Sequence, residues 1–320
     1  MRVWECRRYG GPEVLRQANR PRPAPGPDEV LIRMAATTVS SGDARIRASD
    51  FPGGFWLPAR MMLGLLRPRR KVLGCQLSGV VAEVGENVSR FAPGNEVTAF
   101  PDTRLGAHAE FAAVPQRAVE AKPFGLDFAE SAALGFGGTT ALWFLRETAR
   151  LKRGEKLLVI GASGAVGSAA VQIGRHLGAR VTGVCSGPNM NLVHSLGAVE
   201  VTDYTRVDPF AGGPHHVIFD TVGSTTFAQA LGALAPDGRY LAAVASVIAM
   251  LRAGKKDSGA EMIAGSPPDA PALFADVVAM AAAGVLRPLI DSQFPFSALP
   301  QAHARVDSHH KRGSVVVTLT

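Results

Sequence analysis

The chain has 320 residues, of which 47% are hydrophobic and 19% charged, and its net charge is +7 at pH 7. These values describe a globular protein with a sizeable core and room for two domains. No apolar run is long enough to span a membrane, and the amino terminus lacks the apolar core of a signal peptide. We therefore expect a cytoplasmic protein with no membrane partner.

The cysteines and the basic residues suggest no special class of protein. Cys6, Cys75 and Cys185 are widely spaced and form neither a disulfide framework nor a zinc-type Cys-x-x-Cys pair. The densest basic cluster, residues 67–71, lies among Leu, Met and Pro residues without interleaved aromatic residues. A solvated surface with some attraction for an anionic cofactor is therefore favoured over nucleic-acid binding.

Short strands separated by Gly and Pro turns are predicted in the first third of the chain. Residues 29–36, 77–84 and 96–100 have strand character, and helical periodicity is weak. This pattern favours a partly open β-barrel. Residues 51–66 are apolar and broken by Pro and Gly, which predicts a loop with a short helix over a cleft.

The character of the sequence changes near Pro123. Asp127 and Glu130 form a capping-box pattern, glycines at 135–138 interrupt the run that follows, and residues 139–151 resume as a helix. Strands and helices then alternate, which predicts a parallel sheet with helices on both faces. Strands are expected at 157–160, 181–185, 199–202, 217–220, 240–245 and 286–290, and helices at 165–177, 189–196, 225–234 and 271–283.

Two later segments are predicted to lie outside this alternation. Residues 246–268 are irregular and rich in Lys and Gly, which indicates a surface excursion. Beyond Phe294 we expect one short helix and a closing strand at 314–320, which need not belong to the nucleotide-binding unit.

A glycine-rich turn between a predicted strand and a predicted helix, residues 161–167, is the strongest chemical signal. Gly161 permits a sharp turn, Gly164 lets the backbone approach a pyrophosphate, and Gly167 lets the helix pack closely on the strand. The helix N-terminus offers free N–H groups and a positive dipole to phosphates. Ala162 replaces the first glycine of the usual pattern, and a close-packed turn remains an alternative, but the flanking elements favour dinucleotide binding.

The end of the second strand bears on the choice of dinucleotide. An acid about 20 residues past the glycines binds the free 2′-hydroxyl of NAD. Here Ser186 follows the strand, and no acid occurs before Glu200. Because a carboxylate would repel a 2′-phosphate, its absence permits NADPH, which we favour over NADH. No arginine occurs at 186–191, so phosphate contacts are expected from Ser186, backbone amides and Tyr204.

Motifs of one protein family occur in order along nearly the whole chain. They are Tyr9-Gly-Gly-Pro-Glu-Val-Leu15, Pro25-Gly-Pro-Asp-Glu-Val-Leu31, Gly74-x-x-x-Ser78-Gly-Val-Val-x-Glu83-Val-Gly85, Pro93-Gly94-x-x-Val97, Ala109-Glu-Phe111, the glycine turn, Phe219-Asp220-Thr-Val-Gly223, Gly238-Arg-Tyr240, Arg287-Pro288 and Lys311-Arg-Gly-Ser-Val-Val316. With them the chain resembles the medium-chain dehydrogenase/reductase superfamily, and within it the zinc-lacking quinone oxidoreductase (zeta-crystallin-like) group.

The resemblance implies an α/β fold of two domains. A GroES-like catalytic domain, a partly open β-barrel, would comprise residues 1–123 and 291–320. A Rossmann dinucleotide-binding domain, a doubly wound parallel sheet, would comprise residues 124–290. The cofactor would lie in the cleft between them, and a homodimer is expected.

The positions of the zinc ligands in zinc-dependent relatives are changed in this chain. Ser40 stands at the first position, Cys75-Gln76 replaces a His-Glu pair, and residues 134–140 supply no third ligand. One cysteine alone is no zinc site, because zinc takes three or four protein ligands. The adjacent pairs His215-His216 and His309-His310 lie outside these motifs and are expected at turns or strand ends. We therefore expect no zinc.

This absence guides the predicted chemistry. Without a Lewis acid, nothing lowers the pKa of an alcohol for oxidation. Hydride delivery to a quinone or an α,β-unsaturated carbonyl needs only positioned donors for the oxyanion, and solvent can supply the proton. We expect an NADPH-dependent quinone or enone reductase. Two alternatives stay open: a zinc-type alcohol dehydrogenase, and a non-catalytic NADPH-binding sensor or nucleic-acid-binding protein.

The resemblance also implies site residues. Ser40 could donate to a substrate carbonyl or cap its turn, Asp43 and Arg47 would form an ion pair that positions the loop, and no general acid is identified. Cofactor contacts are expected from Thr140 on the nicotinamide side, Gly161, Ala162, Ser163, Gly164, Ala165, Val166 and Gly167 around the pyrophosphate, Ser186 and Tyr204 near the adenosine phosphate, and Val222, Gly223, Ala243 and Val244 near the nicotinamide ribose.

Overall fold

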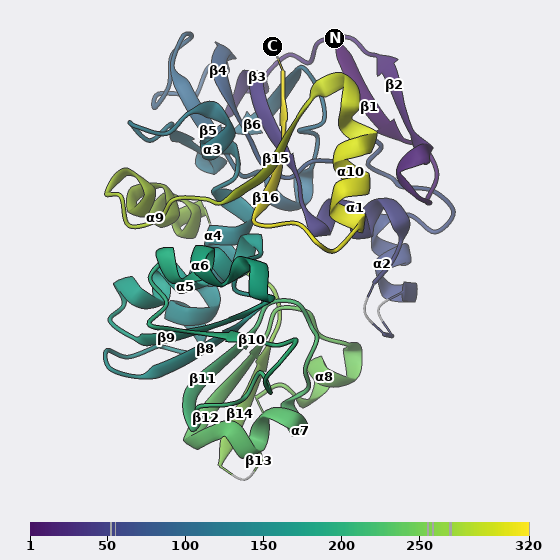
Figure 1. Ribbon diagram of the computed structural model, residues 1–320. Coiled ribbons are helices and arrows are strands. Elements are labelled where there is room, and N and C mark those ends of the chain that lie inside the picture. The colour runs from purple at the N-terminus through teal and green to yellow at the C-terminus, as the bar shows by residue number, and fades with distance from the viewer. Residues whose placement is uncertain (52, 55, 255, 258, 269–270, 320) are drawn as a thin grey trace.

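Two seven-stranded sheets organise the chain, one above the other in Figure 1. The structure is a computed structural model, and it describes all residues except 52, 55, 255, 258, 269–270 and 320. The chain leaves the first sheet, builds the second and returns to the first, so the N and C ends lie at the same end of the molecule (Figure 1).

The first sheet is mainly antiparallel, and β3 is its centre. β3 pairs with β4, β6 and β16, and its alternation buries Val30, Ile32 and Met34 in one core. The pairing of β16 with β3 shows that the closing strand belongs to this sheet. In sheet order the strands are β15 (Ile290–Pro295), β16 (Ser314–Thr318), β3 (Glu29–Val39), β4 (Leu77–Val84), β5 (Glu96–Ala99) and β7 (Val119–Ala121), with β6 (Phe111–Pro115) on β3 and a separate ribbon of β1 (Arg2–Cys6) and β2 (Leu15–Asn19).

The second sheet is parallel except for its short last strand. In sheet order its strands are β10 (Glu200–Asp203), β9 (Arg180–Cys185), β8 (Lys156–Ile160), β11 (His215–Asp220), β12 (Leu234–Ala242), β14 (Ala260–Ala264) and β13 (Lys256–Asp257). The chain winds outward from β8 to β10 and then crosses back to β11. This is the doubly wound order of a Rossmann fold, so the predicted α/β class is confirmed.

Two strand predictions in this unit are wrong. Residues 286–289 form no strand, because Leu286 packs into the core and Pro288 has no N–H to donate to a ladder; Ile290 instead begins β15 in the first sheet. The sixth parallel strand is β14, which lies inside the predicted surface excursion at 246–268. Its five residues stand among Gly, Lys and Ser, so the sequence pattern hides it.

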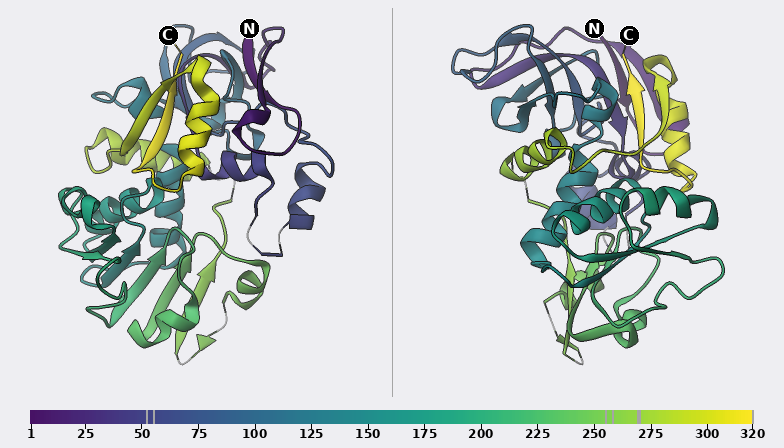
Figure 2. Two further views of the ribbon diagram at one scale, coloured as in Figure 1. Left: turned by 45° about the vertical axis from the view of Figure 1, so that its right-hand side comes forward. Right: turned by 60° about the vertical axis from the view of Figure 1, so that its left-hand side comes forward.

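Helices cover both faces of the second sheet and connect it to the first (Figure 2). Their bounds are α1 (Ser41–Ala48), α2 (Trp56–Leu63), α3 (Phe128–Ala132), α4 (Gly135–Leu142), α5 (Ala165–His176), α6 (Met190–Ser195), α7 (Phe227–Ala230), α8 (Val247–Arg252), α9 (Pro271–Ala282) and α10 (Leu299–Asp307). The predicted capping box before α3 is confirmed: Asp127 accepts from Glu130 N at 2.7 Å, and Glu130 accepts from Asp127 N at 3.1 Å.

The glycines at 135–138 start α4 instead of interrupting a helix, which corrects the sequence-based prediction. A Cβ at Gly137 would lie 2.5 Å from the carbonyl oxygen of Ala165, and one at Gly138 would lie 2.5 Å from Val277. These glycines therefore let α4 pack closely on α5 and α9. The helix continues as a π-helical segment, Trp143–Thr148.

The connection between the two units runs through α3. Its Ala129 and Ala132 pack with Ala36 and Val316 of the first sheet. The domain boundaries, 1–123 with 291–320 and 124–290, stay a prediction.

Candidate cofactor and substrate site

A cavity of about 1140 Å³ lies between the two units. Residues that follow β8, β11 and β12 line one wall: Gly161, Val222 and Ala243. Residues from α1, α4 and the segment before β16 line the others. Open α/β sheets bind ligands at the carboxyl ends of the strands, where the strand order reverses, and that point here lies between β8 and β11. The cavity is therefore the candidate site.

The glycine turn presents backbone to this cavity. Gly161 has φ of +81°, and a Cβ at Gly167 would overlap the carbonyl oxygen of Gly161. Gly164 is the N-cap of α5, with no side chain bonded to the first N–H groups of the helix. A Cβ at Gly164 would meet only Gly161 O, at 3.3 Å. The turn is thus tight inside and open towards the cavity, as a phosphate would require.

The members of the glycine turn divide into two groups. Gly161, Gly164, Ala165 and Val166 line the cavity. Ala162 is fully buried, its N–H donates to Val184 O at 3.0 Å, and its Cβ fills the space beside Gly183. Ala162 and Gly167 therefore determine the shape of the turn, and they lie on the side of the turn that faces the sheet.

The segment before β16 joins the site through Lys311. Lys311 lines the cavity, and its Nζ donates to Gly313 O at 2.7 Å. Burial lowers the pKa of Lys311 to about 8, an effect that nearby Asp291 opposes. The sequence motif contained this lysine but gave it no role. The signal that could have found it is a lysine in the same motif as Gly313, two residues before that glycine.

Ser163, Ser186 and Asn189 form a polar cluster at the outer end of the turn. Asn189 Nδ2 donates to Ser186 Oγ at 3.1 Å and to Ser163 Oγ at 3.4 Å. Within the described residues, Asn189 Oδ1 is buried and has no hydrogen-bond partner. The structure thus brings two predicted residues together and adds Asn189. Tyr204 directly follows β10, its N–H donates to Cys185 O at 3.2 Å, and its side chain is exposed.

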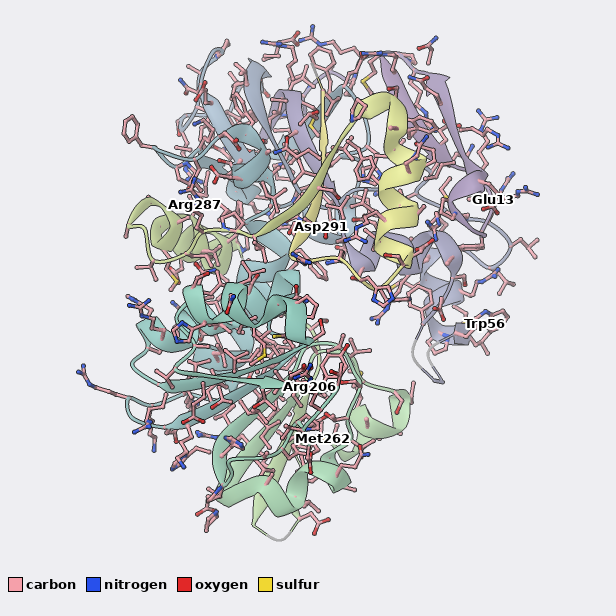
Figure 3. The ribbon with its side chains drawn as sticks, in the orientation of Figure 1. Glu13, Trp56, Arg206, Met262, Arg287 and Asp291 are labelled. Atoms are coloured by element: carbon pink, nitrogen blue, oxygen red, sulfur yellow. The ribbon has the colours of Figure 1, made fainter. Side chains whose placement is uncertain are left out.

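Strand β10 does supply an acidic residue near the outer end of the glycine turn. Asp203 pairs with Cys185 across the strands, and its carboxylate accepts from Thr205 N at 3.0 Å and Thr205 Oγ1 at 2.8 Å. These hydrogen bonds lower the pKa of Asp203, with help from Arg206, whose Nε is 3.7 Å away. Figure 3 shows Arg206 in front of the second sheet. The sequence reasoning missed both residues because the next strand brings them beside the loop after β9.

The loop after β11 lines another part of the cavity. Thr140, Val222, Ala243 and Val244 line the cavity, and their contacts with the nicotinamide end of a cofactor stay a prediction. Gly223, with φ of +80°, packs against Val244 without lining the cavity.

Asp220 holds this loop in place. It is fully buried and accepts from the N–H groups of Val222 at 2.9 Å, Gly223 at 2.8 Å and Thr225 at 2.8 Å. Asp220 therefore positions the loop from beneath the cavity wall.

Ser40 caps α1. Its Oγ donates to Asp43 Oδ2 at 2.6 Å and accepts from Asp43 N at 3.1 Å. Asp43 also accepts from Gly74 N at 2.9 Å. Ser40 lines the cavity, but its proton is directed to Asp43. A donor role for Ser40 towards substrate stays a prediction.

Arg47 does not pair with Asp43, which corrects the expected ion pair. Its Nη2 lies 2.7 Å from Asp307 Oδ2, and its Nε donates to Gly10 O at 3.1 Å. Arg47 is almost fully buried and joins α1 to α10. Its role is therefore structural.

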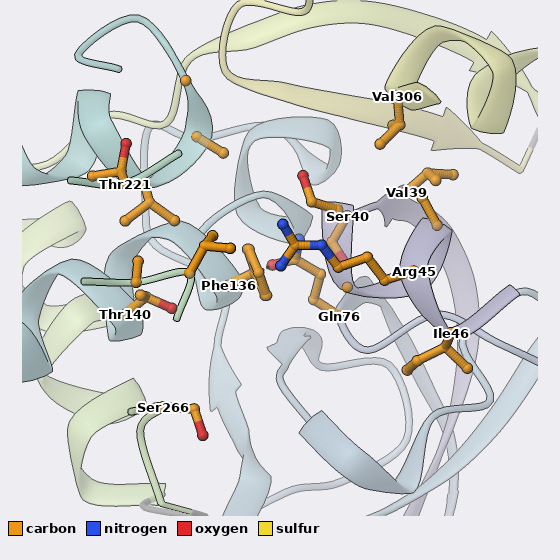
Figure 4. Close-up of a pocket in the computed structure, with 18 of the residues that line it drawn as sticks. Val39, Ser40, Arg45, Ile46, Gln76, Phe136, Thr140, Thr221, Ser266 and Val306 are labelled. Atoms are coloured by element: carbon orange, nitrogen blue, oxygen red, sulfur yellow. Dashed lines mark hydrogen bonds between the residues drawn. The ribbon is translucent and has the colours of Figure 1, made fainter. Parts of the chain in front are cut away.

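Arg45 is a further cation that reaches into the cavity, besides Lys311. Figure 4 shows its guanidinium extending from α1 to the space beside Ser40, Gln76 and Phe136. No hydrogen bond to this side chain occurs among the described residues. Burial lowers the pKa of Arg45, and Asp50 partly offsets the effect, yet arginine remains charged. The sequence analysis missed Arg45, because no motif marked it.

The residues at the zinc positions do not suit zinc. Cys75 Sγ lies 3.8 Å from Ser40 Oγ, so the set offers one thiol with a hydroxyl and an amide. The amide of Gln76 donates to Thr38 Oγ1 at 2.5 Å and accepts from Phe136 N at 2.8 Å. Protein zinc sites use Cys, His and carboxylate ligands. In the part of the chain that the structure describes, no three such side chains gather.

Comparison with known proteins places this arrangement in a family. An alcohol dehydrogenase GroES-like domain model matches residues 26–124, and a zinc-binding dehydrogenase model matches residues 196–317. The mitochondrial NAD(P)H oxidoreductase RTN4IP1 of Mus musculus is 32% identical over 363 aligned positions, covering 100% of this chain and 89% of that protein. The quinone oxidoreductase of Pseudomonas aeruginosa is 33% identical over 238 positions, covering 72% and 69%.

A solved structure agrees on the fold. The quinone oxidoreductase from Coxiella burnetii has a TM-score of 0.88 to this chain at 23% identity, covering 100% of this chain and 99% of that one. The full-length similarity to RTN4IP1 and the ordered motifs agree with this fold. The chain therefore belongs to the medium-chain dehydrogenase/reductase superfamily, in its quinone oxidoreductase (zeta-crystallin-like) group.

Proposed function

We propose that this protein is a zinc-independent, NADPH-dependent reductase that delivers hydride to a quinone or an α,β-unsaturated carbonyl. One observation carries the proposal: Arg45 reaches, without a hydrogen-bond partner among the described residues, into the same cavity that the glycine turn lines. A dinucleotide site and a free cationic donor thus share one cavity. The names of the relatives agree with this chemistry.

The dinucleotide would lie along the carboxyl ends of the parallel strands. The N–H groups at the start of α5 and the ammonium of Lys311 would hold the pyrophosphate. Thr140, Val222 and Ala243 would surround the nicotinamide end. When bound, the nicotinamide supplies the hydride.

Arg45 would stabilise the negative charge that develops on the substrate oxygen. Of the neighbouring polar side chains, Ser40 donates its only proton to Asp43, and the Gln76 amide donates one of its two protons to Thr38. A guanidinium in a partly dehydrated cavity stabilises an oxyanion more strongly than it would in water. A solvent proton can complete the reduction, so the proposal needs no general acid.

NADPH is proposed over NADH because of the groups at the adenosine end. Arg206 lies beside Asp203, close to the loop that contains Ser186, and its positive charge partly offsets the charge of that carboxylate. Ser186, Tyr204 and Arg206 would share the 2′-phosphate, and the carboxylate of Asp203 is occupied by Thr205. A homodimer and a cytoplasmic location remain part of the proposal.

Steady-state oxidation of NADPH with 9,10-phenanthrenequinone and simple enones tests the function. We expect turnover with metal-free protein and no gain from added zinc. Stoichiometric zinc retained on purification, together with alcohol oxidation, would instead support a zinc-type alcohol dehydrogenase. Tight NADPH binding without turnover of either substrate class would support a non-catalytic sensor.

A further inference from the structure

Helix α2 exposes most of its apolar side chains. Its only buried described residue is Ala59. Large apolar side chains that are at least half exposed follow one another over this helix and the turn after it: Trp56, Leu57, Met61, Met62, Leu65 and Leu66. We call these six residues the α2 surface. Figure 3 shows Trp56 at the outer edge of the molecule. Such a concentration of exposed apolar side chains indicates an interaction site.

Arg60 fastens α2 to the body of the protein. Its Nε donates to Ser49 Oγ at 2.6 Å, its Nη1 donates to Leu65 O at 2.7 Å, and its guanidinium stacks 4.0 Å from the Tyr9 ring centroid. The one charged residue of the helix is therefore turned inward, and the apolar residues are left outside. This is the reverse of an ordinary surface helix.

A basic segment follows the α2 surface directly. Arg67, Arg69, Arg70 and Lys71 are exposed, and none forms an ion pair with a carboxylate among the described side chains. Residues 51–82 contain five Lys or Arg residues and no Asp or Glu. Exposed apolar side chains beside uncompensated cations are the combination that binds anionic lipid surfaces.

The α2 surface lies close to residues that line the cavity, since Phe51, shortly before α2, is one of them. The N–H of Val247 donates to Gly53 O at 3.1 Å, which joins the segment before α2 to the start of α8. Met250 of α8 lines the cavity and is 41% exposed, and Leu251 beside it is 72% exposed. Figures 1 and 2 place α2 and α8 on the same side of the molecule.

We propose that the α2 surface and the basic segment dock the protein on an anionic phospholipid membrane, with the entrance of the cavity at the bilayer surface. No helix in the described chain is both long and apolar enough to cross a bilayer, so the contact would be superficial. This differs from the expectation, based on sequence, that there is no membrane partner. The docking is independent of the proposed reductase function, because neither cofactor nor substrate takes part in it.

A second copy of the chain is a poorer occupant of this surface. A two-fold contact places the same patch on both partners, so two basic segments without carboxylates would face each other. Their repulsion would oppose the apolar contact. An anionic bilayer complements both the apolar and the basic part.

Co-sedimentation of the full chain with vesicles tests the proposal. We expect binding to phosphatidylcholine vesicles that contain about one third phosphatidylserine, little binding to pure phosphatidylcholine, and weakening by high salt. The double variants Arg69→Glu/Arg70→Glu and Met61→Ser/Met62→Ser should each reduce binding by roughly tenfold or more. The matched control is Lys152→Glu/Arg153→Glu, at the amino ends of the parallel strands, which should bind as the wild type does.

Fluorescence and mass measurements complete the test. Tryptophan emission should shift to the blue on anionic vesicles, and Trp56→Phe should remove the shift. Equal binding by the α2 variants and the control would overturn the proposal. The proposal would also be overturned if the wild type did not bind vesicles and Met61→Ser/Met62→Ser changed the oligomeric mass. That result would assign the α2 surface to contact with a second copy of the chain. NADPH oxidation with a water-soluble quinone should be unchanged in these variants, so failure of docking is distinguishable from failure of the reductase proposal.

Discussion

The backbone N–H of Gly313 donates to the carbonyl oxygen of Ser163 over 2.8 Å. Gly313 also bridges Gly164 in a parallel arrangement. The segment that leads into β16 of the first sheet is therefore fastened to the glycine turn of the second. This contact places Lys311, two residues earlier, in the cavity beside the predicted phosphate site.

Lys311 should make cofactor binding depend on pH. Its pKa is lowered to about 8, so the ammonium is present at pH 7 and is lost as the pH rises through that value. The Kd for NADPH should accordingly increase between neutral pH and about pH 9, an effect that fluorescence titration would measure. Lys311→Met should raise the Kd by about tenfold or more at pH 7 and flatten this dependence. An unchanged pH profile in Lys311→Met would contradict the assignment.

Gly164→Asp should abolish cofactor binding. The substitution places a carboxylate beside the start of α5, where it would repel the pyrophosphate. Gly164→Ala is the matched control, because its Cβ would contact only Gly161 O at 3.3 Å. Calorimetric titration with NADPH should show weak or moderate loss for alanine and no measurable binding for aspartate. Equal affinities of the two variants would show that the phosphate lies elsewhere.

Arg45→Met should lower kcat for quinone reduction by about 10²–10³-fold, which is the usual cost of removing an oxyanion donor. The Kd for NADPH should change little, because Arg45 stands on α1 and the glycine turn is on the opposite unit. Arg45→Lys keeps the charge and should retain part of the activity. A kcat for Arg45→Met equal to that of the wild type would remove Arg45 from the proposed mechanism.

Sequence patterns predicted the elements whose residues carry local signals. The strand before Gly161, the helix after Gly164 and the capping box of Asp127 all depend on residues within a few positions of one another. The end of the second unit was misjudged, because Leu286 and Pro288 look like a strand end until tertiary packing is known. Strand β14 was missed for the opposite reason, since its neighbours carry loop composition.

The site residues likewise divide into those that the sequence predicted and those that it did not. Gly161 and Val222 line the cavity and lie in sequence motifs, and Thr140 lines it at a position that the resemblance pointed to. Lys311 lines the cavity from the segment before β16, and Arg206 lies beside Asp203 after the end of β10, at distances along the chain that no local pattern encodes. Arg47 was assigned a neighbour four residues away, whereas the fold pairs it with Asp307 of α10.

Arg206→Ala should weaken the preference for NADPH over NADH. Arg206 is 3.7 Å from Asp203 and extends into solvent, so its removal leaves an uncompensated carboxylate beside the 2′-phosphate position. We expect kcat/KM for NADPH to fall by about tenfold and that for NADH to stay nearly constant. Arg180→Ala, at the opposite end of β9, is the control. Parallel losses with both cofactors would argue against a phosphate contact.

Two buried histidines should make the fold sensitive to acid. The rings of His108 and His303 are fully buried, with their centroids 5.4 Å apart in an edge-to-face arrangement. Neither ring nitrogen of His303 has a hydrogen-bond partner among the described residues, whereas His108 Nε2 lies 3.1 Å from Thr38 O. Burial lowers the pKa of both residues, and that of His303 falls well below its ordinary value.

The sign of the effect follows from proton uptake by the unfolded chain. Below about pH 6.5 the unfolded histidines take up protons and the folded ones do not, so the free energy of unfolding should decrease as the pH is lowered. Above about pH 6.5 this loss of stability should be absent. One such histidine contributes a slope of up to about 1.4 kcal/mol per pH unit. Urea unfolding between about pH 7.5 and about pH 5.5 would measure it. His303→Leu should reduce the slope, exposed His194→Leu should preserve it, and equal slopes in both variants would refute the assignment to His303.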